Sequence, residues 1–256
     1  MDKPKSTKMN QNSVIVSLAN ALERTGLEKV CVVSDVLYKK GIADYLGVDL
    51  FHTTRGRTIA FGVGLKLGNP KLKIIVLMGD LVTIGGNHFM HAARRNIDLT
   101  VICINNFIYK LKNAPSVNSV FPLYICPEQP FNIPHLAKSC GAVYVARWTA
   151  LHKAELTNSI AEALQKQGFS VIEAISPGEG NFAGVDGVAS DAREKLLKFY
   201  YDNSEIKDTE PTENLAIDSD KKIIVGKFVD WERPTFIDLY NNQLRHTLGN
   251  KFVPYE

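Results

Sequence analysis

The chain has 256 residues, of which 45% are hydrophobic and 22% are charged, and its formal net charge at pH 7 is +3. This length and composition are typical of one large globular domain, with or without a tail. The small charge does not indicate binding to nucleic acid or to an anionic membrane. No apolar run is long enough for a membrane helix and the N-terminus is polar, so we expect a cytoplasmic location.

Helical patterns alternate with short apolar runs along most of the chain. After a flexible N-terminal tail at residues 1–12, the expected helices are 13–24, 58–67, 86–95, 133–140, 153–167 and 190–201, and the expected strands are 29–34, 73–78, 99–104, 142–146 and 170–175. Short, fully apolar strands between helices are typical of a parallel sheet covered on both faces. We therefore predict an α/β fold with a doubly wound, mostly parallel sheet.

The composition changes after residue 201. Residues 13–201 hold the predicted α/β domain, and residues 202–256 are expected to be a linker and a C-terminal tail that packs on the domain or on a partner subunit. Within the domain, residues 112–134 are rich in Pro, Asn and Ser and lack a clear period. A loop of this length is usually functional or ordered by a partner.

Polar residues follow two of the predicted strands. Gly79 and Asp80 come after the first, and Asn105 and Asn106 come after the second. Parallel strands end at the same edge of a sheet, where ligands bind, so Asp80 and Asn106 are expected side by side. A carboxylate, an amide oxygen and a nearby carbonyl suit Mg²⁺, which would bridge to a diphosphate. Asp and Asn are also common turn formers, so this pattern alone leaves both interpretations open.

Three longer stretches carry a family resemblance. The strings HTTRGRTIAFGVGLKLGNPKLKIIVLMGD, IGGNHFMHAARRNIDLTVICINNFIY and ERPTF resemble the β subunit of 2-oxoacid:ferredoxin oxidoreductases, over roughly Ser13 to Pro234. The resemblance implies a thiamine-diphosphate-binding fold. It also implies oxidative decarboxylation of a 2-oxoacid of the pyruvate/2-oxoglutarate class, with coenzyme A as acyl acceptor and ferredoxin or a ferredoxin-like chain as electron partner.

The resemblance assigns residues to the cofactor site. Asp80, Asn106 and the carbonyl of Ile108 would hold Mg²⁺. The other residues expected at the cofactor are Gly79, Arg55, Lys110 and Leu111 along the diphosphate, and Val36, Leu37, Tyr38 and Lys39 near the thiazolium. The family places the activating glutamate on an α-type partner subunit. No catalytic residue is therefore assigned to this chain, and we expect a hetero-oligomer.

The sequence departs from the family at the iron–sulfur ligands. STKMNQN stands where the family has a CPGCG-like motif, and Tyr38 and Ser176-Pro177-Gly178 stand where the other cluster cysteines fall. Because a cubane cluster needs those thiolates, we expect no iron–sulfur cluster on this chain and electron transfer through clusters on partner chains. Cys31 and Cys103 lie inside apolar runs and are expected to be core thiols.

The cofactor loop also departs from the family. The Gly79-Asp80 loop is two residues shorter, and Arg55 and Lys110 replace a histidine and a glycine. The added charges fit compensation for lost backbone contacts. They fit equally well another anion, or a Lys110 that fills the site. Two other functions therefore stay open: a non-oxidative thiamine-dependent decarboxylase or carboligase subunit, and a degenerate structural subunit.

Overall fold

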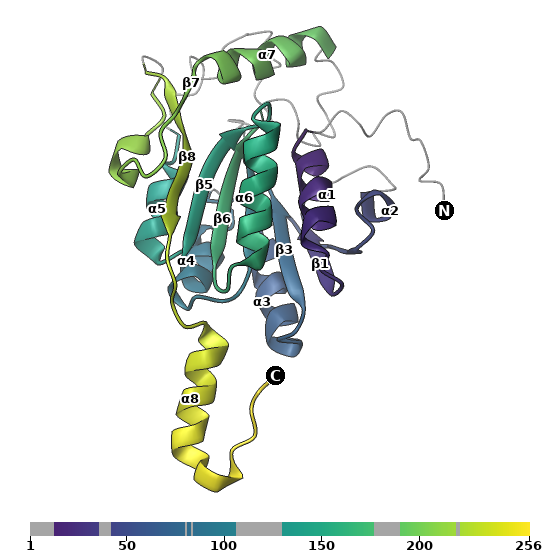
Figure 1. Ribbon diagram of the computed structural model, residues 1–256, viewed down its shortest axis with the longest axis vertical. Coiled ribbons are helices and arrows are strands. Elements are labelled where there is room, and N and C mark those ends of the chain that lie inside the picture. The colour runs from purple at the N-terminus through teal and green to yellow at the C-terminus, as the bar shows by residue number, and fades with distance from the viewer. Residues whose placement is uncertain are drawn as a thin grey trace.

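The computed structural model describes residues 13–35, 42–79, 81–82, 84–105, 130–176, 190–218 and 221–256. These residues form a sheet with helices against both of its faces (Figure 1). The strands are β1 (Val30–Ser34), β2 (Asp49–His52), β3 (Lys73–Met78), β4 (Thr100–Asn105), β5 (Tyr144–Thr149), β6 (Ser170–Ile175), β7 (Ser204–Ile206) and β8 (Ile223–Asp230). The helices are α1 (Ser13–Thr25), α2 (Ile42–Leu46), α3 (Thr58–Gly68), α4 (Gly86–Arg94), α5 (Ile133–Cys140), α6 (Lys153–Gln165), α7 (Ser190–Asp202) and α8 (Phe236–Leu248), with 3-10 turns η2 (Thr212–Leu215) and η3 (Gly249–Lys251).

Within the described residues the sheet has eight strands in the order β2-β1-β3-β4-β6-β5-β8-β7. Neighbouring strands run parallel except for β5 and β8, which are antiparallel. The inner strands β1, β4, β5 and β6 are buried along their whole length. Burial on both faces explains why their sequences are mostly apolar. The prediction of a doubly wound, mostly parallel α/β sheet is confirmed.

Alternate residues of each strand point to the two faces and build two apolar cores. One core joins the sheet to α1 and α6 and includes Ile102 and Ile104 of β4. The other joins the sheet to α3, α4 and α5 and includes Val101 and Cys103 of the same strand. Cys31 is also in this second core, so the prediction that Cys31 and Cys103 are core thiols is confirmed.

The C-terminal part of the chain contributes more structure than the sequence indicated. Residues 202–220 contain β7 and η2 instead of a plain linker, and β8 extends the sheet beside β5. After β8, helix α8 extends below the sheet, away from the edge where the parallel strands end (Figure 1). None of the residues of α8 is buried in the described chain. The division of the chain at residue 201 stays a prediction, although the sheet itself continues past that point.

Two strand boundaries also differ from expectation. β5 ends at Thr149 instead of residue 146, and β4 ends at Asn105 instead of residue 104. Arg147, Thr149 and Asn105 lie beyond the expected bounds, and these polar side chains are buried. Among the described residues, no helix is long and apolar enough to span a membrane, and a cytoplasmic location stays a prediction.

Candidate functional site

Four neighbouring parallel strands, β1, β3, β4 and β6, end at one edge of the sheet. Their registers pair Ser34 with Leu77, Met78 with Cys103 and Asn105 with Ile175. We call this the carboxyl edge. It is the place where open α/β sheets bind ligands. The residues that follow these strands in the chain, 36–41, 80, 106–129 and 177–189, lie outside the described residues.

Most of the predicted site residues fall in those segments. The ligands expected for Mg²⁺, Asp80, Asn106 and Ile108, lie outside the described residues. The same holds for the expected cofactor neighbours Val36, Leu37, Tyr38, Lys39, Lys110 and Leu111. Of the predicted site, Gly79 and Arg55 are described, and the assigned roles of all these residues stay predictions.

Gly79 and the end of β4 are direct neighbours. A Cβ placed on Gly79 would lie 3.9 Å from the carbonyl oxygen of Ile104. Gly79 is joined to Asp80, and Ile104 is followed by Asn105 and Asn106. The crossover through α4 thus brings together the two points from which the expected metal-ligating residues leave the sheet. The structure confirms the topology that places these two strand ends side by side.

The turn that carries Arg55 is fixed at the same edge. The carboxylate of Asp35, just after β1, accepts a hydrogen bond of 2.7 Å from the backbone N–H of Gly56. The N–H of Thr53 donates to the Ser34 carbonyl at 2.9 Å. Gly56 has φ +72°, and a Cβ there would overlap the side chain of Ile84. Only glycine fits this conformation and this close approach. Arg55 itself is exposed.

The N-terminus of α4 points its first backbone amides toward the same edge, because α4 follows β3 in the crossover. Gly85 occupies the N-cap position and has no side chain, while the N–H of His88 in the first turn donates to Oδ1 of Asn87 at 2.8 Å. The other amides of the first turn and the helix dipole favour an anion at this position. Arg57 is exposed nearby and donates to Nε2 of His88 at 3.3 Å. Arg57 and the N-terminus of α4 therefore supply positive charge that suits a phosphate group, beside the acidic Asp35.

The contact with Arg57 also bears on His88 and His91, which lie one turn apart on α4. A guanidinium can only donate hydrogen bonds, so Nε2 of His88 is engaged as an acceptor. Among the described residues, no three His, Cys, Asp or Glu side chains are placed to hold a metal ion. This pair therefore gives no indication of a metal site.

A buried polar network below the carboxyl edge was not anticipated from the sequence. Glu173 on β6 accepts from Nε of Arg147 on β5 at 2.7 Å, and both side chains are 0% exposed. The other carboxylate oxygen of Glu173 accepts from Nδ2 of Asn105 at 2.7 Å. We call Arg147, Glu173 and Asn105 the buried triad. Its signal in the sequence is one acid and one base, each alone in an apolar strand.

The arginine of the buried triad reaches beyond the sheet. Nη1 of Arg147 donates to the carbonyl of Leu215 in η2 at 2.8 Å. Its Nη2 is buried and has no hydrogen-bond acceptor in the described chain. A buried donor without a partner costs free energy, so this network is not arranged for maximal stability.

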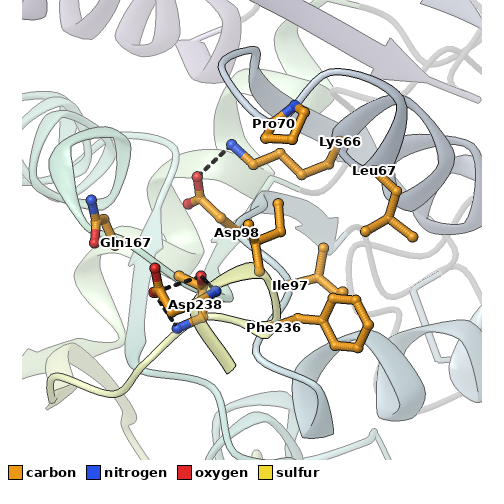
Figure 2. A pocket seen from close by; sticks show the side chains of 10 residues that line it. Lys66, Leu67, Pro70, Ile97, Asp98, Gln167, Phe236 and Asp238 are labelled. Carbon is orange, nitrogen blue, oxygen red and sulfur yellow. Dashed lines mark hydrogen bonds and ion pairs between the residues drawn. The ribbon is translucent and has the colours of Figure 1, made fainter. Parts of the chain in front are cut away.

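A small cavity of about 160 Å³ lies at the opposite, amino edge of the sheet. Its walls come from the end of α3, the segments before β4 and β6, and the start of α8. Figure 2 shows Lys66 reaching Asp98 on one side, with Phe236 and Asp238 across the cavity. Asp98 is held by Lys66 at 2.7 Å and by Lys73 at 3.1 Å. The cavity contains none of the predicted site residues.

The ion pairs of this cavity perturb one carboxyl group. Burial opposes ionisation of Asp98, but the ammonium groups of Lys73 and Lys66 prevail and hold its pKa below the ordinary value. All of these charges have partners within the chain. We interpret the cluster as a structural tie between α3, β3 and β4.

Comparison with known proteins identifies the family. The family model for the C-terminal TPP binding domain of thiamine pyrophosphate enzymes matches residues 31–174. Subunit KorB of the 2-oxoglutarate synthase of Methanothermobacter marburgensis is 38% identical over 251 residues, 92% of this chain and 86% of that protein. The corresponding KorB of Archaeoglobus fulgidus is 43% identical over 174 residues, 64% of this chain and 65% of that protein.

A solved structure agrees with these sequence relatives. The 2-oxoglutarate:ferredoxin oxidoreductase from Magnetococcus marinus superimposes with a TM-score of 0.70 and 25% identity, over 92% of this chain and 85% of that chain. The residues matched by the family model include the carboxyl ends of β1, β3 and β4 and stop at residue 174, one residue before the end of β6. The chain therefore belongs to the β-subunit family of the 2-oxoacid:ferredoxin oxidoreductases and carries that family's thiamine-pyrophosphate-binding domain.

Proposed function

We propose that this chain is the Mg²⁺–thiamine-diphosphate-binding subunit of a hetero-oligomeric enzyme that oxidatively decarboxylates a 2-oxoacid of the pyruvate/2-oxoglutarate class. The family membership supports the reaction type, and the names of the relatives supply 2-oxoglutarate as the first substrate to test. An α-type subunit would complete the site and supply the activating glutamate. Coenzyme A would take the acyl group.

The observation that carries this proposal is the meeting of Gly79 with the end of β4. Asp80 and Asn106 leave the sheet from these neighbouring points. In the proposal their side-chain oxygens, with the carbonyl of Ile108, hold Mg²⁺, an ion that accepts oxygen ligands and a diphosphate. Gly79 has no side chain to occupy the adjacent space.

The described residues fit the diphosphate. The N-terminus of α4 and the positive charge of Arg55 lie at the same edge and favour a bound anion. In the proposal these groups bind and orient the diphosphate and leave the reactive ring to the interface with the partner. When bound, the coenzyme supplies an electron sink for the decarboxylation.

The electron path in the proposal avoids this chain. The positions that carry cluster cysteines in the family hold other residues here, including Tyr38 and Gly178. The electrons would pass through clusters on partner chains to ferredoxin or a ferredoxin-like chain. The absence of a cluster on this chain remains part of the proposal.

The composition of the native complex tests the proposal as a whole. We expect thiamine diphosphate and Mg²⁺ in amounts equal to this chain, and iron only on partner chains, when the purified complex is separated into subunits and each is assayed. Thiamine diphosphate with no iron anywhere would favour a non-oxidative decarboxylase or carboligase. A stable complex with neither would identify a structural subunit.

The Asp80→Ala variant tests the metal ligands. Removing a ligand is expected to abolish the Mg²⁺-dependent binding of thiamine diphosphate to the complex, as measured by isothermal titration calorimetry. The matched control is Asp202→Ala, which removes an exposed carboxylate at the end of α7. Equal cofactor affinity in both variants would refute the assignment of Asp80.

A further inference from the structure

The buried triad needs an explanation other than stability. The ion pair between Arg147 and Glu173 is fully buried, and the cost of removing two charges from water offsets most of their attraction. Well-packed apolar residues often serve a fold equally well at such positions. The arginine also leaves its Nη2 without an acceptor in the described chain. A network of this kind is better explained by the geometry that it fixes.

The triad fixes the end of β4. One carboxylate oxygen of Glu173 accepts a hydrogen bond from Arg147 and the other accepts one from Asn105, at 2.7 Å each. The Asn105 side chain is therefore held in one orientation by a carboxylate that cannot rotate away from its arginine. The main chain is held as well, because the carbonyl of Asn105 accepts from the N–H of Ser176 at 2.9 Å.

The opposite end of the network is anchored too. Nη1 of Arg147 donates to the Leu215 carbonyl at 2.8 Å, so a continuous set of bonds runs from η2 through β5 and β6 to β4. Asn105 is 5% exposed and is the last residue of β4. The next residue in the chain is Asn106, the proposed metal ligand.

We propose that Glu173, held by Arg147, is a positioning residue that fixes Asn105 and thereby presets the point from which the metal-ligating segment leaves β4. This inference rests on the proposed function. Groups that orient metal ligands without touching the metal typically change its affinity by about 10- to 100-fold when they are removed. The triad is expected to act on Mg²⁺ affinity more than on the stability of the fold.

The Asn105→Ala variant of the native complex separates these two roles, because it cuts the link to β4 and leaves the ion pair intact. We expect the Mg²⁺ dissociation constant, measured by calorimetry with thiamine diphosphate present, to rise about 10-fold or more. Excess Mg²⁺ is expected to restore cofactor binding to the wild-type stoichiometry. A merely structural defect would not respond to the concentration of metal.

A second variant removes the ion pair without leaving a buried charge. In Arg147→Met combined with Glu173→Leu, Asn105 stays in place and loses its acceptor, so we expect a complex that still folds, with the same loss of Mg²⁺ affinity. The matched control is Asn96→Gly, which removes a buried amide at the amino edge. Asn96 is 1% exposed and bonds to the carbonyls of Arg233 and Pro234, and glycine accepts its φ of +50°.

The outcomes distinguish this inference from the proposed function. If Mg²⁺ affinity changes less than about twofold in both triad variants, or falls equally in Asn96→Gly, the positioning role is wrong. If Asp80→Ala abolishes binding while the triad variants bind normally, only the inference fails. If the wild-type complex binds no Mg²⁺–thiamine diphosphate, the proposed function fails with it.

Discussion

At the carboxyl edge, the backbone conformation and the packing at some positions permit only one type of residue. Gly56 combines a left-handed backbone conformation with close packing against Ile84, and its N–H is bound by Asp35. The family motif around it was recognisable in the sequence, but its packing partner was not. Glu173 and Arg147 show the reverse case. Their residue types were visible, while their pairing depended on which strands become neighbours.

Substitution of Gly56 by alanine tests this constraint. The control is Gly26→Ala, where φ is +60° but a Cβ would meet nothing within 4 Å. We expect the control to lose about 1–2 kcal/mol of unfolding free energy through backbone strain alone. Gly56→Ala is expected to lose about 1–3 kcal/mol more because of overpacking against Ile84. Urea unfolding of both variants measures the difference. Equal losses of unfolding free energy would show that the side chain of Ile84 moves aside without a cost in stability.

At the scale of elements, the sequence predicted the buried parallel strands well because each is a short, mostly apolar run. It failed where an element depends on partners. β8 is recognisable as apolar, but nothing local indicates that it joins β5 in antiparallel orientation. The strand expected at 142–146 stops just before Arg147, which is buried inside β5. The short edge strand β2 is mostly exposed and carries little apolar signal.

The contacts between α3, β3 and β4 at Asp98 give an element-scale prediction of pH dependence. The pKa of Asp98 is lowered in the folded state, so its contribution is complete above the ordinary value of about 4 and is lost as the pH falls below it. Asp98→Asn is expected to lower the unfolding free energy at pH 7 by about 3 kcal/mol, because two largely buried lysines lose their counter-ion.

The same variant is expected to lose less additional stability than the wild type between about pH 4 and pH 2, since the titrating group is gone. Urea unfolding at a series of pH values measures both effects, with Asp202→Asn as the exposed control. Parallel stability curves for Asp98→Asn and the wild type below pH 4 would contradict the assignment.

At the scale of the whole molecule, the fold and the family were predictable from the sequence, whereas the details of the site were only partly so. The expected ligands were placed by topology, and the structure confirms the juxtaposition of the strand ends from which they leave. The triad that we infer to position them was missed, because its three members come from β4, β5 and β6. Such long-range pairing has no local pattern in a sequence.

Removal of the metal gives a prediction for the assembled complex. A ligand that binds only the native state at about 100 times its dissociation constant adds about 2.7 kcal/mol of stability. For a protein of this size that corresponds to about 5–10 °C in the unfolding midpoint. We expect EDTA to lower the midpoint of the complex with thiamine diphosphate by this amount, and added Mg²⁺ to reverse it. An Asp80→Ala complex is expected to be insensitive to EDTA. Identical shifts in both complexes would place the stabilising ion elsewhere.

The parallel sheet has a consequence for how such a protein diverges. Each segment that leaves the carboxyl edge follows a strand that is packed in the two apolar cores. The position of the strand therefore does not depend on that segment. A change in one of these segments, such as an insertion, a deletion or the loss of a cysteine, therefore leaves the ends of the other strands in place. Related proteins can therefore gain or lose cluster-binding cysteines in one segment while the sheet keeps the same structure.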